Sequence, residues 1–130
     1  MLAFRITVAV LALIPIGAGA AGVFYGLAFP GFDVSVANPD SQSHFRFLSG
    51  IFLAMGLAYW SVALGIGNWL QRFQLLAMLT FIGGLARLVS LASNGAPSIG
   101  HQIGLGMELI AVPLLLFWSV QRRHSHMRER

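Results

Sequence analysis

Four stretches of roughly 20 mostly apolar residues run through this chain, and no other feature of the sequence limits its fold as strongly. They cover residues 6–29, 46–68, 73–92 and 102–121, and each is long enough for a helix to cross a bilayer. In the first stretch the apolar run continues past Ala20, which favours a membrane span over a cleaved signal peptide. The sequence therefore predicts an all-α integral membrane protein, with one domain over residues 1–130 that forms a bundle of four transmembrane helices.

The composition excludes several classes of protein. Of the 130 residues, 57% are hydrophobic and only 9% are charged, which is too little charge to cover the surface of a soluble domain of this size. The absence of cysteine excludes thiol redox chemistry, disulfides and thiolate metal sites. The net charge of +4 comes mainly from a basic tail at 122–130. A basic tail beside an apolar helix is typical of contact with anionic lipid headgroups, and we expect no nucleic-acid partner.

The positions of the charges predict how the helices are oriented. Arg5, Arg72 and the tail fall on one side of the expected membrane, whereas Asp33 and Asp40 fall on the other. Loops rich in arginine remain in the cytoplasm. Both termini and the loop at Arg72 are therefore predicted to be cytoplasmic.

Small residues at helical spacing predict where the helices pack against one another. In lipid, helices associate through close approach of their backbones, which small side chains allow. The predicted packing faces are Ala18, Gly22 and Gly26 on the first helix, Gly50, Ala54 and Ala58 on the second, and Gly100 and Gly104 on the fourth.

A cluster of polar side chains is expected in the outer half of the bundle. Arg87 lies roughly 10 Å and Glu108 roughly 12 Å below the outer boundary, at 1.5 Å per helical residue. Opposite charges at matching depth should pair, because each alone would be uncompensated in a low dielectric. Arg46 is expected just above them, and His101 on the same helix face as Glu108. His44 completes the predicted cluster, which is either a structural ion pair or the lining of a pocket for an anionic or amphiphilic ligand.

Other kinds of site are not favoured by the sequence. Haem between His44 and His101 is disfavoured, because both histidines begin helices at the interface rather than within the apolar stretches. A metal site that combines them with Asp40 and Glu108 has no ligand spacing to support it. No pairing of a nucleophile with a base is apparent, so no catalytic residue and no cofactor are predicted.

Two segments carry a resemblance to a known family. Residues 44–57, HFRFLSGIFLAMGL, and 81–91, FIGGLARLVSL, are followed by GAP at 95–97 and ELI at 108–110. Together they resemble a bacterial family of small four-helix membrane proteins known as domain of unknown function 4345, over roughly residues 17–118. The resemblance implies a four-helix fold in the bacterial cytoplasmic (inner) membrane. It implies no activity.

Three functions are compatible with these observations. The first is a non-enzymatic membrane protein, either an accessory subunit or a module that binds lipid or another amphiphile, packed in a complex or against copies of itself. The second is an oligomeric transporter or channel for a small anion or proton that uses Arg46, Arg87 and Glu108. The third is a membrane enzyme that acts on an amphiphilic substrate, with Glu108 as acid or base.

Overall fold

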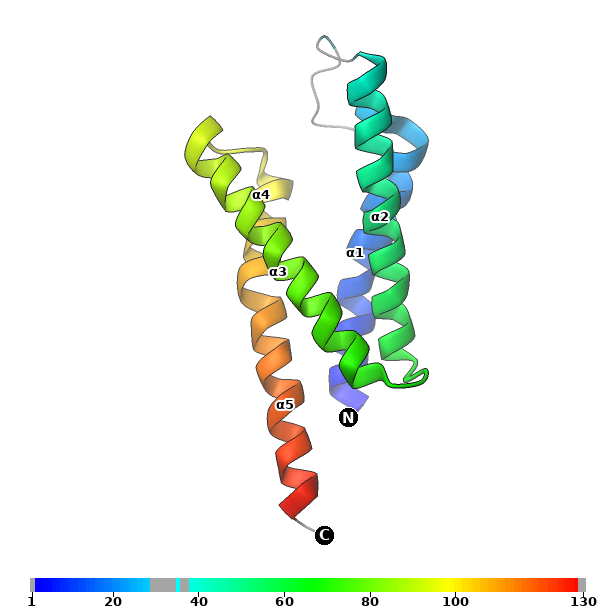
Figure 1. Cartoon of the computed structure of the whole chain (residues 1–130), viewed down its shortest axis with the longest axis vertical. Helices are drawn as coiled ribbons and strands as arrows, with labels where there is room; N and C mark the ends of the chain where they lie inside the picture. The colour runs from blue at the N-terminus through cyan, green and yellow to red at the C-terminus, as the bar shows by residue number, and fades with distance from the viewer. Residues whose placement is uncertain (1, 29–34, 36–37, 129–130) are drawn as a thin grey trace. The chain divides into compact units, whose positions relative to one another are not determined.

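The structure, a computed structural model, is helical throughout its regular elements (Figure 1). It describes residues 2–28, 35 and 38–128, and of residues 122–128 only the backbone, so Asp33 and the side chains of the basic tail lie outside the described residues. In chain order the elements are α1 (Leu2–Tyr25), the 3-10 turn η1 (Gly26–Ala28), α2 (Pro39–Ala63), α3 (Trp69–Asn94), α4 (Ile99–Gly106), the π-helical turn η3 (Met107–Ala111) and α5 (Val112–Arg128).

The number of helices agrees with the sequence. Within the described residues, four helical segments are long and apolar enough to cross a membrane: Leu2–Ala28, Pro39–Ala63, Trp69–Asn94 and Ile99–Gln121. The last of these is continuous through α4, η3 and α5. The chain divides into two compact units, Met1–Trp69 and Leu70–Arg130, which are described in turn.

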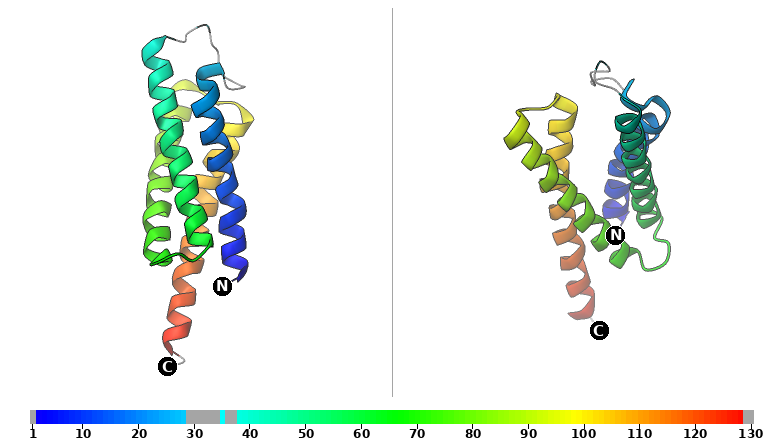
Figure 2. Two further views of the ribbon diagram at one scale, coloured as in Figure 1. Left: turned by 90° about the vertical axis from the view of Figure 1, so that its right-hand side faces the viewer. Right: turned by 45° about the horizontal axis from the view of Figure 1, so that its top comes forward.

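The first unit is the hairpin of α1 and α2, which lie side by side along their length (Figures 1 and 2). Glycines bring the two backbones together. A Cβ atom added at Gly19 would lie 2.5 Å from the main-chain nitrogen of Leu53, and one at Gly22 would collide with Ser49. A Cβ atom added at Gly56 of α2 would lie 2.8 Å from the main-chain nitrogen of Ile16, in α1. Gly19 and Gly22 therefore allow an approach that any side chain would prevent.

The packing face of α2 differs from the predicted one. A Cβ at Gly50 would meet only Cγ2 of Val23, at 4.0 Å, which is an ordinary contact. The close contacts instead follow Ser49, Leu53 and Gly56, a row in which spacings of four and three residues alternate. Alternating spacing of this kind is typical of helices that cross at a small angle, whereas a strict four-residue row favours a steeper crossing. On α1, Gly22 and Gly26 are both buried, as the predicted face requires.

The second helix begins earlier than the predicted span, which starts at residue 46. Asn38 caps its N-terminus: the side chain accepts a hydrogen bond from the main-chain N–H of Ser41, and the Ser41 hydroxyl accepts one from the N–H of Asn38. Pro39 occupies the first turn, where its missing N–H leaves no donor unsatisfied. The helix thus starts at a polar cap, and the apolar stretch begins only after its first two turns.

At its other end α2 stops at Ala63, before the predicted limit of residue 68. Gly65 has φ = 72°, a left-handed conformation that ends helices and strongly favours glycine. The guanidinium group of Arg5, from the start of α1, lies directly against Gly65, where a Cβ atom would collide with it. A cation at this position interacts favourably with the negative end of the α2 dipole.

The second unit is the hairpin of α3 with the segment α4–η3–α5 (Figures 1 and 2). The two helices approach closely at Gly84 of α3, where an added Cβ would lie 2.8 Å from Cδ2 of Leu109 and 2.9 Å from Cβ of Glu108. By contrast, a Cβ atom added at Gly104, a predicted packing residue, would meet nothing within 4 Å. The glycine that brings these helices together is therefore on α3, and Gly104 leaves open space beside α4.

A π-helical turn interrupts the last helical segment immediately before Pro113. The N–H of Val112 donates to the carbonyl of Met107, five residues earlier. Proline has no N–H and its ring clashes with the carbonyl four residues before it, so a widened turn relieves that clash. Pro15, in contrast, lies within α1 without interrupting it.

Candidate functional site

The paired charges expected from the sequence are present in the second unit. Nε of Arg87 donates a hydrogen bond of 3.1 Å to Oε1 of Glu108 and lies 3.0 Å from Oε2. The Arg87 side chain is 38% exposed, whereas that of Glu108 is 11% exposed. The predicted contact between Arg87 and Glu108 is thus confirmed, and the carboxylate is the more deeply buried partner.

Local structure brings the two groups together. Arg87 follows Gly84 by less than one turn of α3, so the close approach at Gly84 also places the arginine beside the opposite helix. Glu108 is the second residue of the π turn η3, and π turns occur frequently at functional sites. The pair is held where the two helices lie close together.

The ion pair leaves hydrogen-bonding capacity unused on both partners. Oε2 of Glu108 is buried and accepts no hydrogen bond from any described residue, because the single N–H on Nε is directed at Oε1. Within the described residues, the only hydrogen bond of the Arg87 guanidinium is the one from Nε, so both terminal NH₂ groups of Arg87 have donors to spare. A purely structural bidentate pair would use these donors on the second carboxylate oxygen.

The main-chain carbonyl of Glu108 also lacks its usual hydrogen-bond donors. In an α-helix its carbonyl would accept from Val112, but that N–H is directed at Met107. In a π-helix the donor would be residue 113, which is proline and has none. Neither of the usual helical donors therefore reaches this carbonyl.

His101 belongs to the same neighbourhood. Its Nδ1 lies 2.9 Å from the hydroxyl of Ser98, at the start of α4. Gly104 is one turn away from Glu108 on the same side of the helix, and open space adjoins it. The second unit thus contains three of the predicted site residues, Arg87, Glu108 and His101, and it brings the first two into contact.

Arg46 and His44 belong to the first unit. Nη1 of Arg46 donates a 2.7 Å hydrogen bond to the carbonyl of Val23 in the last turn of α1. Gly26, with φ = 59°, ends that helix, and Oε1 of Gln42 accepts from the N–H of Leu27 at 3.1 Å. Arg46 therefore caps the C-terminus of α1, where a cation is favourable. That Arg46 also lies close to Arg87 and Glu108 stays a prediction.

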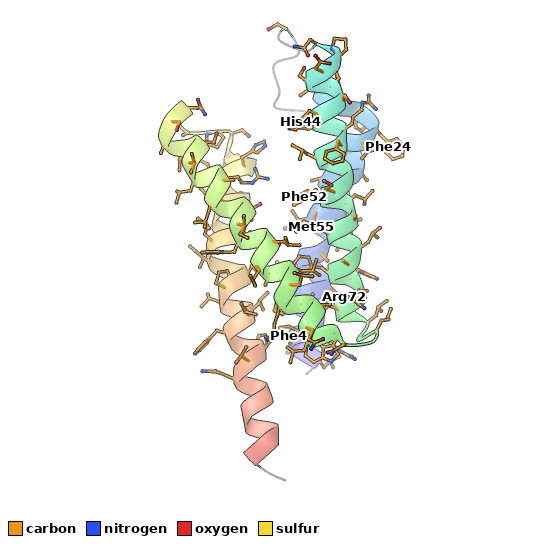
Figure 3. The ribbon with its side chains drawn as sticks, in the orientation of Figure 1. Phe4, Phe24, His44, Phe52, Met55 and Arg72 are labelled. Carbon is orange, nitrogen blue, oxygen red and sulfur yellow. The ribbon has the colours of Figure 1, made fainter. Side chains whose placement is uncertain are left out.

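His44 is an exposed residue in the part of α2 that precedes the apolar stretch (Figure 3). Within the described residues, no three His, Asp or Glu side chains gather as a metal site requires. Two residues outside the predicted cluster shape it: Gly84, which brings the helices together, and Pro113. Sequence reasoning missed the π turn, for which the position of Pro113 five residues after Glu108 was the available signal.

The comparisons with known proteins identify a family and no activity. The model of one protein family, described as Domain of unknown function (DUF4345), matches residues 3–119. No curated protein matches the chain. No solved structure matches it either. Because the family match covers nearly the whole chain, including both hairpins and the Arg87–Glu108 pair, this protein belongs to the family of domain of unknown function 4345.

Proposed function

We propose that the protein is a non-enzymatic integral membrane protein that binds a lipid or another amphiphile at the Arg87–Glu108 pair. The observation that carries this proposal is the Arg87 side chain, which is 38% exposed on an apolar helix and whose two terminal NH₂ groups donate to no described residue. An unsatisfied polar group in an apolar setting is unfavourable by roughly 1–3 kcal/mol, and more for a charged group. A bound molecule with its own hydrogen-bond acceptor would remove this penalty.

The proposed setting is the bacterial cytoplasmic membrane. Large apolar side chains are exposed on every long helix, for example Val10, Leu57, Leu79 and Ile110. Phe24, which is 77% exposed, projects from α1 away from α2 (Figure 3). So many exposed apolar groups suit contact with lipid chains.

The proposed topology places both termini in the cytoplasm, by the distribution of arginines. Reporter fusions after Gln71 and at the C-terminus should have cytoplasmic activity, and a fusion near Asn38 should have activity outside. A fusion at the C-terminus that reports the outside would overturn this topology. The depths assigned to Arg87 and Glu108 would then be reversed as well.

Faces for partner helices are also available in both units. Gly17, Gly83 and Gly100 have nothing within 4 Å of the place where a Cβ atom would be. Small residues on an uncovered face allow another helix to approach closely in lipid. We therefore propose that the protein packs in a membrane complex, as an accessory subunit, or against further copies of itself.

The binding proposal is tested by native mass spectrometry of protein extracted in mild detergent. The wild-type protein should retain a bound amphiphile. The double variant Arg87→Ala/Glu108→Ala should lose it while keeping its helical circular dichroism and its elution volume, since no orphan charge remains. Equal retention by both proteins would mean that the pair holds no ligand. The matched control Gly106→Ala, on α4 where a Cβ meets nothing within 4 Å, should behave as wild type.

A further inference from the structure

The free groups of the Arg87–Glu108 pair that a ligand can reach are hydrogen-bond donors. Among the described residues, Oε2 of Glu108 is the only buried side-chain polar atom that lacks a hydrogen bond. Both Nη atoms of Arg87 also lack a hydrogen bond, so they are not buried and each keeps accessible surface. A guanidinium group has N–H donors and no acceptor. A ligand at Arg87 must therefore present hydrogen-bond acceptors.

The charge of the pair selects among acceptors. Arg87 and Glu108 together are neutral, and both lie on helices apolar enough to cross a membrane. A bound phosphate or carboxylate would add a negative charge without a partner, which is strongly unfavourable in a low dielectric. A carbonyl oxygen accepts hydrogen bonds from a guanidinium group and leaves the site neutral. The pair therefore favours an uncharged ligand with carbonyl acceptors.

The depth of Arg87 in the proposed membrane agrees with an uncharged head. Arg87 lies about two turns before α3 ends at Asn94, which is roughly 10 Å along the helix. An unpaired arginine would extend from there towards the interface, but the contact with Glu108 holds this one in place. The phosphate of a phospholipid lies in the headgroup layer, outside the hydrocarbon core. A lipid without a charged head can reach Arg87 inside that core.

One side of Arg87 is open. Viewed along α3, at about 3.6 residues per turn, Arg87 projects between the directions of Gly84 and Gly83. The Gly84 side packs against Glu108, whereas a Cβ at Gly83 would meet nothing within 4 Å. Leu79, one turn before Gly83 in the same row, is 47% exposed. A planar head can thus lie on the Gly83 side of Arg87, and an apolar chain can continue over Leu79.

We infer that the amphiphile is an uncharged lipid with a carbonyl head, of the prenylated quinone type. A carbonyl oxygen of the quinone accepts from the free NH₂ groups of Arg87, and the prenyl chain lies along the apolar surface of α3. This inference rests on the proposed function, that an amphiphile binds at the pair. The ester carbonyls of a glycerolipid are tied to its headgroup at the membrane surface, whereas a quinone has no group that holds it there.

The test measures binding of three compounds with the same decyl chain to the purified full-length protein, by native mass spectrometry with titrated ligand. The compounds are decyl-benzoquinone, decylbenzene and decyl phosphate. Decyl-benzoquinone should bind about tenfold or more tightly than decylbenzene, because decylbenzene has the ring and the chain but no carbonyl for Arg87. Decyl phosphate should also bind about tenfold or more weakly than the quinone, because its charge has no partner in the hydrocarbon.

Two variants locate the site. In Arg87→Ala/Glu108→Ala the quinone should bind no more tightly than decylbenzene, since the donors are absent and no orphan charge remains. Gly83→Leu should cover the open side of Arg87 and weaken quinone binding about tenfold or more, with the contact to Glu108 intact. The matched substitution Gly106→Leu, on the side of α4 opposite to Glu108, should leave binding unchanged. Unchanged circular dichroism and elution volume show that each variant is folded.

The outcomes separate this inference from the proposed function. Equal binding of decyl-benzoquinone and decylbenzene would overturn the quinone assignment, and so would unchanged quinone binding in Gly83→Leu. Tighter binding of decyl phosphate than of the quinone, with loss in the Arg87→Ala/Glu108→Ala variant, would overturn the assignment but uphold an amphiphile site at the pair. A preference for the quinone that the double variant retains would refute the inference, because the quinone then binds elsewhere. The proposed function fails separately, if the double variant retains the co-purified amphiphile as the wild-type protein does.

Discussion

Replacing Arg87 by alanine is expected to destabilise the folded protein by about 3–5 kcal/mol, the usual effect of removing one partner of a buried ion pair. The carboxylate left behind is 11% exposed and one of its oxygens already lacks a hydrogen bond. With Arg87 absent, Glu108 would keep no donor from the described residues around it. Thermal unfolding in detergent, followed by circular dichroism, measures the loss.

The reverse substitution should have a smaller effect. In Glu108→Ala the stranded charge is that of Arg87, whose side chain is 38% exposed and long enough to extend towards the membrane interface. We therefore expect a loss of about 1–3 kcal/mol, which is less than the roughly 3–5 kcal/mol usual for a buried partner. The double variant should lose less than the sum of the two single variants, because no orphan charge remains. Strictly additive effects, or a larger loss in Glu108→Ala, would contradict the structure of this pair.

Substitution of Gly19 by alanine is expected to destabilise the first hairpin by about 1–3 kcal/mol, which is the usual range for overpacking. The added Cβ would lie 2.5 Å from the main-chain nitrogen and 2.7 Å from Cα of Leu53. These are backbone atoms, so the two helices must separate, whereas a side chain could rotate away. The measurement is the midpoint of unfolding in detergent.

Two matched substitutions show whether the effect comes from this contact. Gly22→Ala should also destabilise, but less, because the atom nearest to its Cβ, Oγ of Ser49, can move to another rotamer, whereas Cβ of Ser49, 2.8 Å away, cannot. Gly50→Ala should be neutral or stabilising, by up to about 1 kcal/mol, because alanine favours helix and its nearest neighbour, Cγ2 of Val23, is 4.0 Å away. If Gly50→Ala destabilised as much as Gly19→Ala, the packing face of α2 would be the one predicted from the sequence.

Pairing of Arg87 with Glu108 could be predicted because the alternatives were few. The two charges interrupt otherwise apolar helices, lie at similar distances from the same loop, and are unfavourable unless they meet. Arg46 had more alternatives. It lies in the third turn of α2, within reach of main-chain carbonyls at the end of α1, and in the structure it binds the carbonyl of Val23. The sequence offered no means to choose between that acceptor and a carboxylate.

The packing faces could be predicted only in part for a related reason. Glycine and alanine occur on several sides of each helix, and each set permits close approach. On α1 both Gly22 and Gly26 are buried, but on α2 the contacts follow Ser49, Leu53 and Gly56 instead of Gly50. Which row is used depends on the crossing angle of the hairpin, and that angle is set by all the side chains in contact.

By itself, then, the sequence determined the number of long apolar helices and the meeting of its two mid-helix charges. Both follow from large local free-energy costs. In an apolar setting, a backbone without hydrogen bonds and a charge without a partner are both too unfavourable to persist, which excludes other arrangements. Tertiary structure alone decided that Ser49 packs on Gly22, that Arg46 caps α1, and that Glu108 lies in a π turn. These features depend on differences of an ångström or less in how the helices fit. Van der Waals contacts and hydrogen bonds are sensitive to such small differences. The pattern of residue types along the sequence does not reveal them.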